Sequence, residues 1–187
     1  MFKHELRKYY LQKRIDLSDQ EKATLDMKIK SRFENYLPDY IKTVHTYIPI
    51  PSKDEVDTWP IIYGLWEKNI QVAVPIMDPD KNILSSYQLT RETQLKVNGW
   101  KVPEPVDSKL IKNTFIDAVV VPLLSFDLNG NRVGYGKGFY DSFLSSLDKK
   151  VIKIGLSYFP AIEKISDPDP WDIPLDVCIT PDQLFKF

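Results

Sequence analysis

The clearest chemical pattern in the chain is the segment FDLNGNRVGYGKGFY, residues 126–140. The chain has seven glycines, and four of them lie in one nine-residue window of this segment: Gly130, Gly134, Gly136 and Gly138. Glycine reaches positive φ values at no steric cost and lets backbone N–H groups approach a ligand closely. Arg132 and Lys137 add cationic donors, and Asp141, just beyond the segment, could hold Mg²⁺ or orient one of those cations. The pattern favours an anion-binding loop between a strand and a helix.

This loop matches neither of two familiar phosphate motifs. A Walker A loop needs Ser or Thr after Gly-Lys, whereas Gly138 follows Lys137 here. The GxGxxG motif needs a glycine where this chain has Phe139. The alternative interpretation is a tight, left-handed turn that carries a solvated arginine and lysine.

A second basic element lies at the N-terminus. Lys3, Arg7 and Arg14 are spaced by four and seven residues, which places them within about 40° of each other on a helix. Phe2, Leu6 and Tyr9 form an apolar stripe, which we expect to pack against the sheet and to present the basic face beside it. An ordinary solvated face is the alternative.

The elements that must position these residues follow from hydrophobic periodicity and turn residues. Helices are expected over residues 2–14, 19–36, from about 56 onwards, and 139–147. Strands are expected over 43–50, 70–76, 83–89, 118–124, 151–157 and 177–180, with an extended segment over 99–107. Ser18 and Glu21 form a capping box, and Pro60 suits the first turn of the third helix. Strands alternating with helices indicate an α/β layered sheet, and the run 118–124, apolar on both faces, is typical of a central parallel strand.

The composition fits one globular domain over residues 1–187, with 43% hydrophobic and 27% charged residues. The net charge of −1 counts against a dedicated nucleic-acid binder. One cysteine, Cys178, excludes an intramolecular disulfide, and with two histidines it makes a Cys/His zinc site untenable, so we expect Cys178 and His45 in the core. Without an apolar span or a secretory signal, the protein is expected to be soluble and cytoplasmic, as a monomer or homodimer.

Three blocks together resemble one known family. They are Lys3-x-x-Leu6-Arg7, the segment DEVDT at 54–58, and GNRVGYGKGFYD at 130–141. In this order and spacing they are similar to the 5-formyltetrahydrofolate cyclo-ligases, also called 5,10-methenyltetrahydrofolate synthetases, and the resemblance covers nearly the whole chain. It implies a three-layer α/β/α, Rossmann-like fold with a mostly parallel sheet. It also implies ATP-dependent closure of 5-formyltetrahydrofolate to 5,10-methenyltetrahydrofolate through a phosphorylated formyl group, with Mg²⁺ and with release of ADP and phosphate.

The resemblance assigns roles to the two basic elements. Lys3 and Arg7 would grip the nucleotide phosphates. The ATP-binding loop would consist of Arg132, Val133, Gly134, Tyr135, Gly136, Lys137, Gly138, Phe139 and Tyr140. Within it, Lys137 and Arg132 would act on the migrating phosphoryl group, and Asp141 would ligate Mg²⁺.

Folate contacts are implied as well. Glu55 would accept hydrogen bonds from the donor edge of the pterin; alternatively it is a carboxylate stabilised by a helix N-terminus. The pterin side would be lined by Ile50, Tyr135, Gly136, Lys137, Gly138 and Phe139. Trp100 would stack on the ligand or lie in the core. The chain departs from many relatives in having Trp171-Asp172 in place of His-Asp, which leaves Asp172 a structural role.

Two rival functions remain open at this point. One is another ATP-dependent activator of a formyl or carboxyl group on the same scaffold. The other is a non-catalytic module that binds RNA or another polyanion through the basic helix and the Arg132/Lys137 loop, which the net charge disfavours.

Overall fold

A computed structural model describes residues 1–78, 80–81 and 83–187. Its helices are α1 (Lys3–Ile15), α2 (Asp19–Tyr36), α3 (Trp59–Glu67) and α4 (Phe139–Ser145), with single 3₁₀ turns at Pro51–Lys53 and Asn113–Phe115. The strands are β1 (Thr43–His45), β2 (Gln71–Asp78), β3 (Ile83–Leu89), β4 (Leu95–Val97), β5 (Pro103–Pro105), β6 (Leu110–Ile111), β7 (Ala118–Val121), β8 (Ser125–Phe126), β9 (Arg132–Val133), β10 (Ile152–Leu156), β11 (Val177–Ile179) and β12 (Leu184–Lys186).

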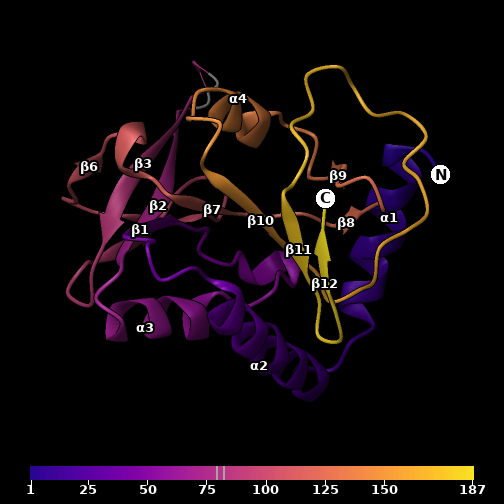
Figure 1. Cartoon of the computed structure of the whole chain (residues 1–187), viewed down its shortest axis with the longest axis horizontal. Coiled ribbons are helices and arrows are strands. Elements are labelled where there is room, and N and C mark those ends of the chain that lie inside the picture. Colours follow the sequence, from indigo (N-terminus) through magenta and orange to yellow (C-terminus); the bar gives the residue numbers. More distant parts are fainter. Residues whose placement is uncertain (79, 82) are drawn as a thin grey trace.

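The centre of the molecule is a mostly parallel sheet of eight strands in the order β12-β11-β10-β7-β1-β2-β3-β6 (Figure 1). The five strands from β11 to β2 pair in parallel, and antiparallel pairing is confined to the two edges. β7 lies in the middle, as its run of apolar residues predicts. β4–β5 and β8–β9 form separate two-stranded ribbons.

Helices cover both faces of the sheet, which confirms the predicted three-layer α/β/α class. Figure 1 shows α4 on one side of the sheet and α2 and α3 on the other. The side chains of β7 alternate accordingly: Ala118 and Val120 pack with the residues of α1–α3, whereas Val119 and Val121 pack with Phe143 and the rest of α4. Two apolar layers therefore fix the sheet, and the loops at its end carry the polar residues.

Several expected elements begin or end elsewhere than predicted. The central strand, expected over 118–124, ends at Val121. The first strand stops at His45 rather than residue 50, and the third helix starts at Trp59 rather than near 56. The intervening residues are tied down by side chains: the Thr58 hydroxyl donates to the Tyr47 carbonyl at 2.7 Å, and the Asp57 carboxylate accepts from the Trp59 N–H at 3.0 Å. Such side-chain to backbone bonds compete with regular structure, so this stretch stays irregular.

Helix α1 buries a different face from the one predicted. The apolar stripe of Phe2 and Tyr9 is half exposed, and the buried residues are Lys3, Leu6, Tyr10 and Arg14. The expectation that the Phe2–Leu6–Tyr9 stripe packs inward is therefore wrong. Two basic side chains take its place because each finds partners inside the fold.

The remaining core expectations are confirmed. His45 and Cys178 are fully buried, and burial lowers the pKa of His45 to about 3. Ser18 and Glu21 form the predicted capping box at the start of α2. Across the described ranges, no helix combines the length and the apolar character that crossing a membrane requires.

Candidate active site

The glycine loop, residues 134–138, connects the β8–β9 ribbon to α4. The predicted strand–loop–helix order is interrupted by this ribbon, so Arg132 belongs to β9 and is held by its ladder with Phe126. Gly138 has φ +74° and forms the N-cap of α4. Lys137 is exposed at the tip of the loop, between two glycines with positive φ. The loop thus presents Lys137 and backbone N–H groups to solvent at the start of a helix.

Arg7 meets this loop directly, as predicted for the two basic elements. Its Nε donates to the Gly134 carbonyl at 2.9 Å. At Gly136, φ is +83°, and a Cβ would lie 3.2 Å from the Arg7 guanidinium. Glycine is therefore required at position 136 for two reasons, the backbone conformation and the stacked guanidinium.

Lys3 has a different environment from Arg7. Its ammonium lies 2.7 Å from Asp169 and 2.5 Å from Asp172, and the side chain is 9% exposed. Burial acts to lower the pKa of Lys3, but the bonds and charges of the two aspartates outweigh it and the pKa is raised. Both carboxylates come from the irregular segment before β11. Asp172 thus has a structural role, whereas Trp171 beside it is 70% exposed.

The segment that holds Lys3 also holds Arg132 and Asp141. Arg132 Nη2 lies 2.6 Å from Asp141 Oδ1, and Arg132 Nη1 donates to the Ile173 carbonyl. The Ile173 N–H donates back to Asp141 Oδ1 at 3.1 Å. Within the described residues both bonds to Asp141 use Oδ1, so Oδ2 faces no protein donor. A carboxylate oxygen without a protein partner, beside the glycine loop, is the kind of ligand that Mg²⁺ takes, since Mg²⁺ usually binds one or two protein carboxylates and completes its shell with phosphate and water.

Glu55 lies beside the glycine loop. Its Oε2 accepts from the Ile50 N–H at 2.7 Å, and its Oε1 accepts from the Tyr135 hydroxyl at 2.8 Å. Burial raises the pKa of Glu55, and these two bonds oppose the rise together with the charges of Arg14 and Lys53. Because α3 starts four residues later, Glu55 is not in a helix N-terminus, and the helix-dipole alternative is wrong.

Helix α2 braces the segment that carries Glu55. Asp26 Oδ1 accepts from the Tyr158 hydroxyl at 2.7 Å and from the Asp57 N–H at 3.0 Å. The Tyr158 hydroxyl also reaches the Glu55 carbonyl at 3.2 Å. One turn earlier, Lys22 pairs with Asp54 at 2.6 Å. Asp54 and Asp57, which flank Glu55 on its two sides, are thus held from the same helix.

Trp100 is 51% exposed, so the core alternative for it is wrong. Its ring centroid lies 6.2 Å from that of Phe139, the first residue of α4. An exposed indole beside a buried phenyl ring at the end of the glycine loop is available to stack on a flat ligand.

Sequence reasoning missed four residues of this network: Arg14 as a contact of the loop, and Asp26, Tyr158 and Asp169. Arg14 is 2% exposed, and its Nη1 donates to the Tyr135 hydroxyl at 3.2 Å. The available signal was its position: Lys3, Leu6, Tyr10 and Arg14 recur at helical spacing on one face. The other three depend on tertiary contacts that no local pattern encodes.

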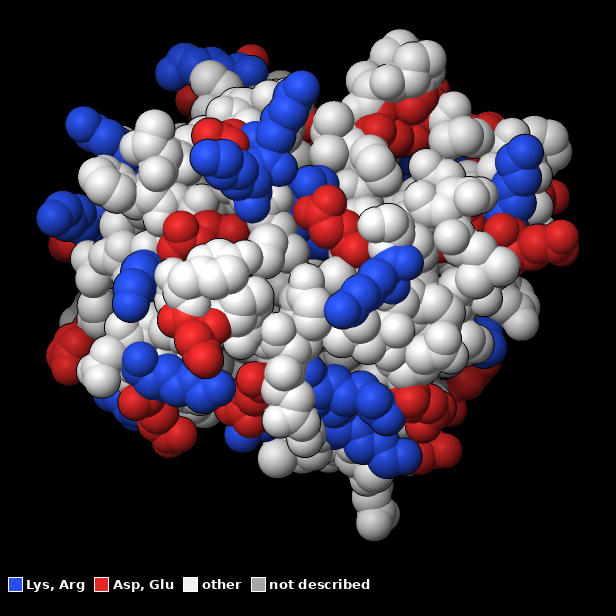
Figure 2. All heavy atoms as spheres, in the orientation of Figure 1, with Lys and Arg blue, Asp and Glu red and all other residues white. Residues whose placement is uncertain are grey.

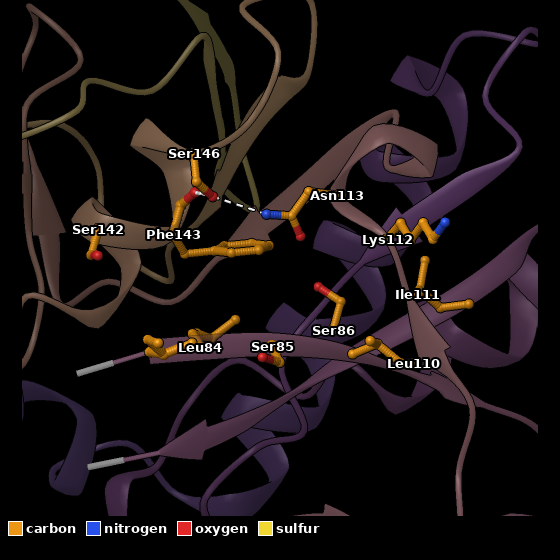
Figure 3. Close-up of a pocket in the computed structure, with 11 residues that line it drawn as sticks. Leu84, Ser85, Ser86, Leu110, Ile111, Lys112, Asn113, Ser142, Phe143 and Ser146 are labelled. Carbon is orange, nitrogen blue, oxygen red and sulfur yellow. Dashed lines mark hydrogen bonds between the residues drawn. The ribbon is translucent and has the colours of Figure 1, made fainter. Parts of the chain in front are cut away.

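A cavity of about 300 Å³ lies away from this network, between β3, β6 and α4 (Figure 3). Leu84 and Ser86 project from β3 toward Phe143, and an Asn113–Ser146 hydrogen bond crosses one side. None of the predicted site residues lines it. The candidate site lies instead around the glycine loop.

The visible surface charge is mixed. Figure 2 shows Lys/Arg and Asp/Glu interspersed over the face it presents, without a broad basic field. Together with the net charge of −1, this argues against the polyanion-binding alternative. Across the described residues, no cluster of three Asp, Glu, His or Cys side chains has the arrangement of a metal site, so any metal here would share its ligands with a substrate.

Comparisons with known proteins agree with this geometry. The model of the 5-formyltetrahydrofolate cyclo-ligase family matches residues 1–181. The chain is 34% identical to the 5-formyltetrahydrofolate cyclo-ligase of Mycoplasma pneumoniae, over 96% of this chain and 98% of that protein. It is 28% identical to the enzyme of the same name from Escherichia coli K12, over 94% and 98%.

Solved structures give the same result. The 5,10-methenyltetrahydrofolate synthetase of Aquifex aeolicus superposes with a TM-score of 0.84 at 35% identity, covering 100% of this chain and 93% of that one. The synthetase of Mycoplasma pneumoniae superposes with a TM-score of 0.79 at 31% identity, over 97% and 99%. The sequence match, the fold and the loop geometry all lead to one conclusion: the chain belongs to the 5-formyltetrahydrofolate cyclo-ligase family of enzymes.

Proposed function

We propose that this protein closes 5-formyltetrahydrofolate to 5,10-methenyltetrahydrofolate at the expense of ATP, releasing ADP and phosphate. The observation that carries the proposal is the position of Glu55, whose carboxylate is bonded to Tyr135 of the glycine loop. A candidate pterin acceptor and a candidate phosphate loop are therefore adjacent, as transfer between the two ligands requires.

The chemistry explains why both ligands are needed. The formyl group is attached to N5, and its oxygen is a poor leaving group, so N10 cannot displace this oxygen directly. Transfer of the γ-phosphoryl group of ATP to this oxygen forms an imidate-like phosphate, with ADP as the leaving group. N10 then attacks the formyl carbon and loses its proton to water, the C–O bond breaks, and inorganic phosphate leaves with the oxygen.

The side chains divide this work by charge. Arg7 and the exposed Lys137 border the loop and would neutralise the phosphate oxygens as the phosphoryl group moves, the main requirement of phosphoryl transfer. Lys3 would join them by exchanging one of its two aspartates for a phosphate. Glu55 would accept hydrogen bonds from the pterin, since each of its oxygens keeps a lone pair beyond the bond it already receives. Trp100 and Phe139 would contact the flat ring.

Mg²⁺ would be held by Asp141 Oδ2 together with the nucleotide, and it would supply charge neutralisation at the phosphate oxygens. Asp141 also fixes Arg132 through Oδ1. In this proposal Arg132 and Asp141 act as one unit.

The test is the appearance of methenyl-product absorbance when the protein is mixed with ATP, Mg²⁺ and 5-formyltetrahydrofolate. ATP consumption should require the folate, because a cyclo-ligase has no acceptor without it. Consumption without folate, or none with it, would contradict the proposal.

A variant at Glu55 distinguishes the binding of 5-formyltetrahydrofolate from the binding of ATP. Glu55→Gln keeps one oxygen for the Ile50 N–H and can donate its amide to the Tyr135 hydroxyl, so the fold should tolerate it. Charge-assisted bonds contribute roughly 1.5–3 kcal/mol, so 5-formyltetrahydrofolate should bind about tenfold to hundredfold more weakly while ATP binding is unchanged. Calorimetric titration of each ligand measures this, with the exposed Glu163→Gln as control. Equal loss of both ligands would mean that Glu55 organises the whole site and does not bind the pterin.

A further inference from the structure

Arg14 is a buried cation without a direct counter-charge. Its side chain belongs to the inward face of α1, and the residue is 2% exposed. Nη2 donates to the Leu123 carbonyl and Nη1 to the Tyr135 hydroxyl, whereas Nε has no partner among the described residues. Burying a guanidinium is costly unless an anion is near, so the position needs an explanation beyond packing.

The Tyr135 hydroxyl oxygen links Arg14 to the carboxylate of Glu55. A tyrosine hydroxyl accepts and donates at the same time. That of Tyr135 accepts from Arg14 at 3.2 Å and donates to Glu55 Oε1 at 2.8 Å. The chain Arg14–Tyr135–Glu55 therefore joins α1, the glycine loop and the segment before α3.

We propose that Arg14 is a positioning residue which, through the Tyr135 hydroxyl, holds the Glu55 carboxylate in the orientation and charge state that receives the pterin. This inference rests on the proposed function and adds a residue to it. Arg14 itself is too deeply buried to touch either substrate.

The groups around Glu55 predict how folate binding would change if the hydrogen bonds that link Arg14, Tyr135 and Glu55 were lost. Burial raises the pKa of Glu55, while the Ile50 N–H, Tyr135, Arg14 and Lys53 lower it. Tyr47 and Tyr140 also face the carboxylate, and burial keeps both phenols neutral by raising their pKa. Removing the Arg14 charge or the Tyr135 hydroxyl should therefore raise the pKa of Glu55 further. The variants would then lose folate affinity mainly at low pH, because a protonated Glu55 cannot accept two bonds from pterin donors.

The experiment is calorimetric titration of 5-formyltetrahydrofolate at pH 6 and at pH 8.5. Arg14→Gln removes the charge, and Tyr135→Phe removes a single oxygen and keeps the ring. Lys8→Gln, on the exposed side of α1, is the matched control for charge. Each variant is compared with the parent protein at the same pH, so that ionisation of the ligand cancels.

We expect both variants to bind about tenfold more weakly than the parent at pH 6, where the raised pKa leaves more of Glu55 protonated, and within about threefold of it at pH 8.5. The double variant should lose less affinity than the two single losses combined, since Arg14 and Tyr135 act on Glu55 partly through one hydroxyl, and Lys8→Gln should match the parent. If Arg14→Gln fails to fold, Tyr135→Phe carries the test.

Three results would overturn the inference. An equal loss at both pH values would assign Arg14 a purely structural role. Additive losses in the double variant would mean that Arg14 does not act through Tyr135. A parent protein that does not bind 5-formyltetrahydrofolate at either pH would refute the proposed function itself, which is distinguishable from a parent that binds while its variants show no pH-dependent loss.

Discussion

Asp26 offers a quantitative test of how the Glu55 segment is held. Burial raises its pKa from 3.8 to about 6, against the opposing hydrogen bonds from Tyr158 and Asp57. The folded protein therefore holds the Asp26 proton more tightly than the unfolded chain does. Its contribution to stability is present at low pH and is lost as the pH rises through about 6.

The magnitude follows from these two pKa values. Between pH 5 and pH 8 a group with pKa 3.8 unfolded and about 6 folded loses about 1.4 kcal/mol of stabilisation. Residual solvent contact reduces this to about 1 kcal/mol. Asp26→Asn should remove the pH dependence but keep both hydrogen bonds, since Tyr158 and Asp57 donate to the same oxygen, Oδ1.

The assay is urea denaturation of the parent protein and of Asp26→Asn at pH 5 and pH 8. The free energy of unfolding of the parent, relative to that of the variant, should fall by about 1 kcal/mol between the two pH values. Asp19→Asn removes the same charge from the exposed first turn of α2, and its difference from the parent should stay constant. A parent that gains stability relative to Asp26→Asn as the pH rises would refute the argument, because it would mean that the buried carboxylate is stabilised as an anion.

Two further predictions concern the phosphate side of the site. Lys137→Ala should lower kcat by about 100-fold or more while changing the folate KM little, because its charge is needed chiefly as the phosphoryl group moves; steady-state kinetics beside the exposed Lys149→Ala measure this, and a near-normal kcat would exclude a phosphoryl contact. Asp141→Asn keeps an oxygen for Arg132 and Ile173 but loses the charge that Mg²⁺ needs, so the Mg²⁺ concentration for half-maximal rate should rise. Tm should fall as well, because the buried Arg132 loses its counter-charge. An unaltered Mg²⁺ titration would assign the metal to ATP alone.

The sequence was sufficient for the layers of the fold and for the position of the glycine loop. The apolar composition of a run such as 118–124 is enough to predict that it is buried, and the capping box at Ser18 is a local sequence signal for the start of a helix. The buried strand and the capped helix are both present in the folded protein because the local preference and the tertiary contacts agree there.

The face of α1 could not be predicted in the same way. Periodicity counts Phe2 and Tyr9 as core and Lys3 and Arg14 as surface, but the reverse holds because Asp169, Asp172 and Tyr135 supply partners. The same limit applies to Asp26, which pairs with residues 31 and 132 positions away. A polar residue at a core position is interpretable only when its partner is known.

The attachment of Lys3 to Asp169 and Asp172 has a consequence for protein synthesis. Lys3 lies 166 residues before Asp169 and 169 residues before Asp172, so α1 is synthesised long before the segment that holds its first turn. Contacts of such separation form late, because the intervening chain must first be ordered. A ribosome-bound chain that has not yet reached residue 169 therefore lacks both of the carboxylates that hold the Lys3 ammonium.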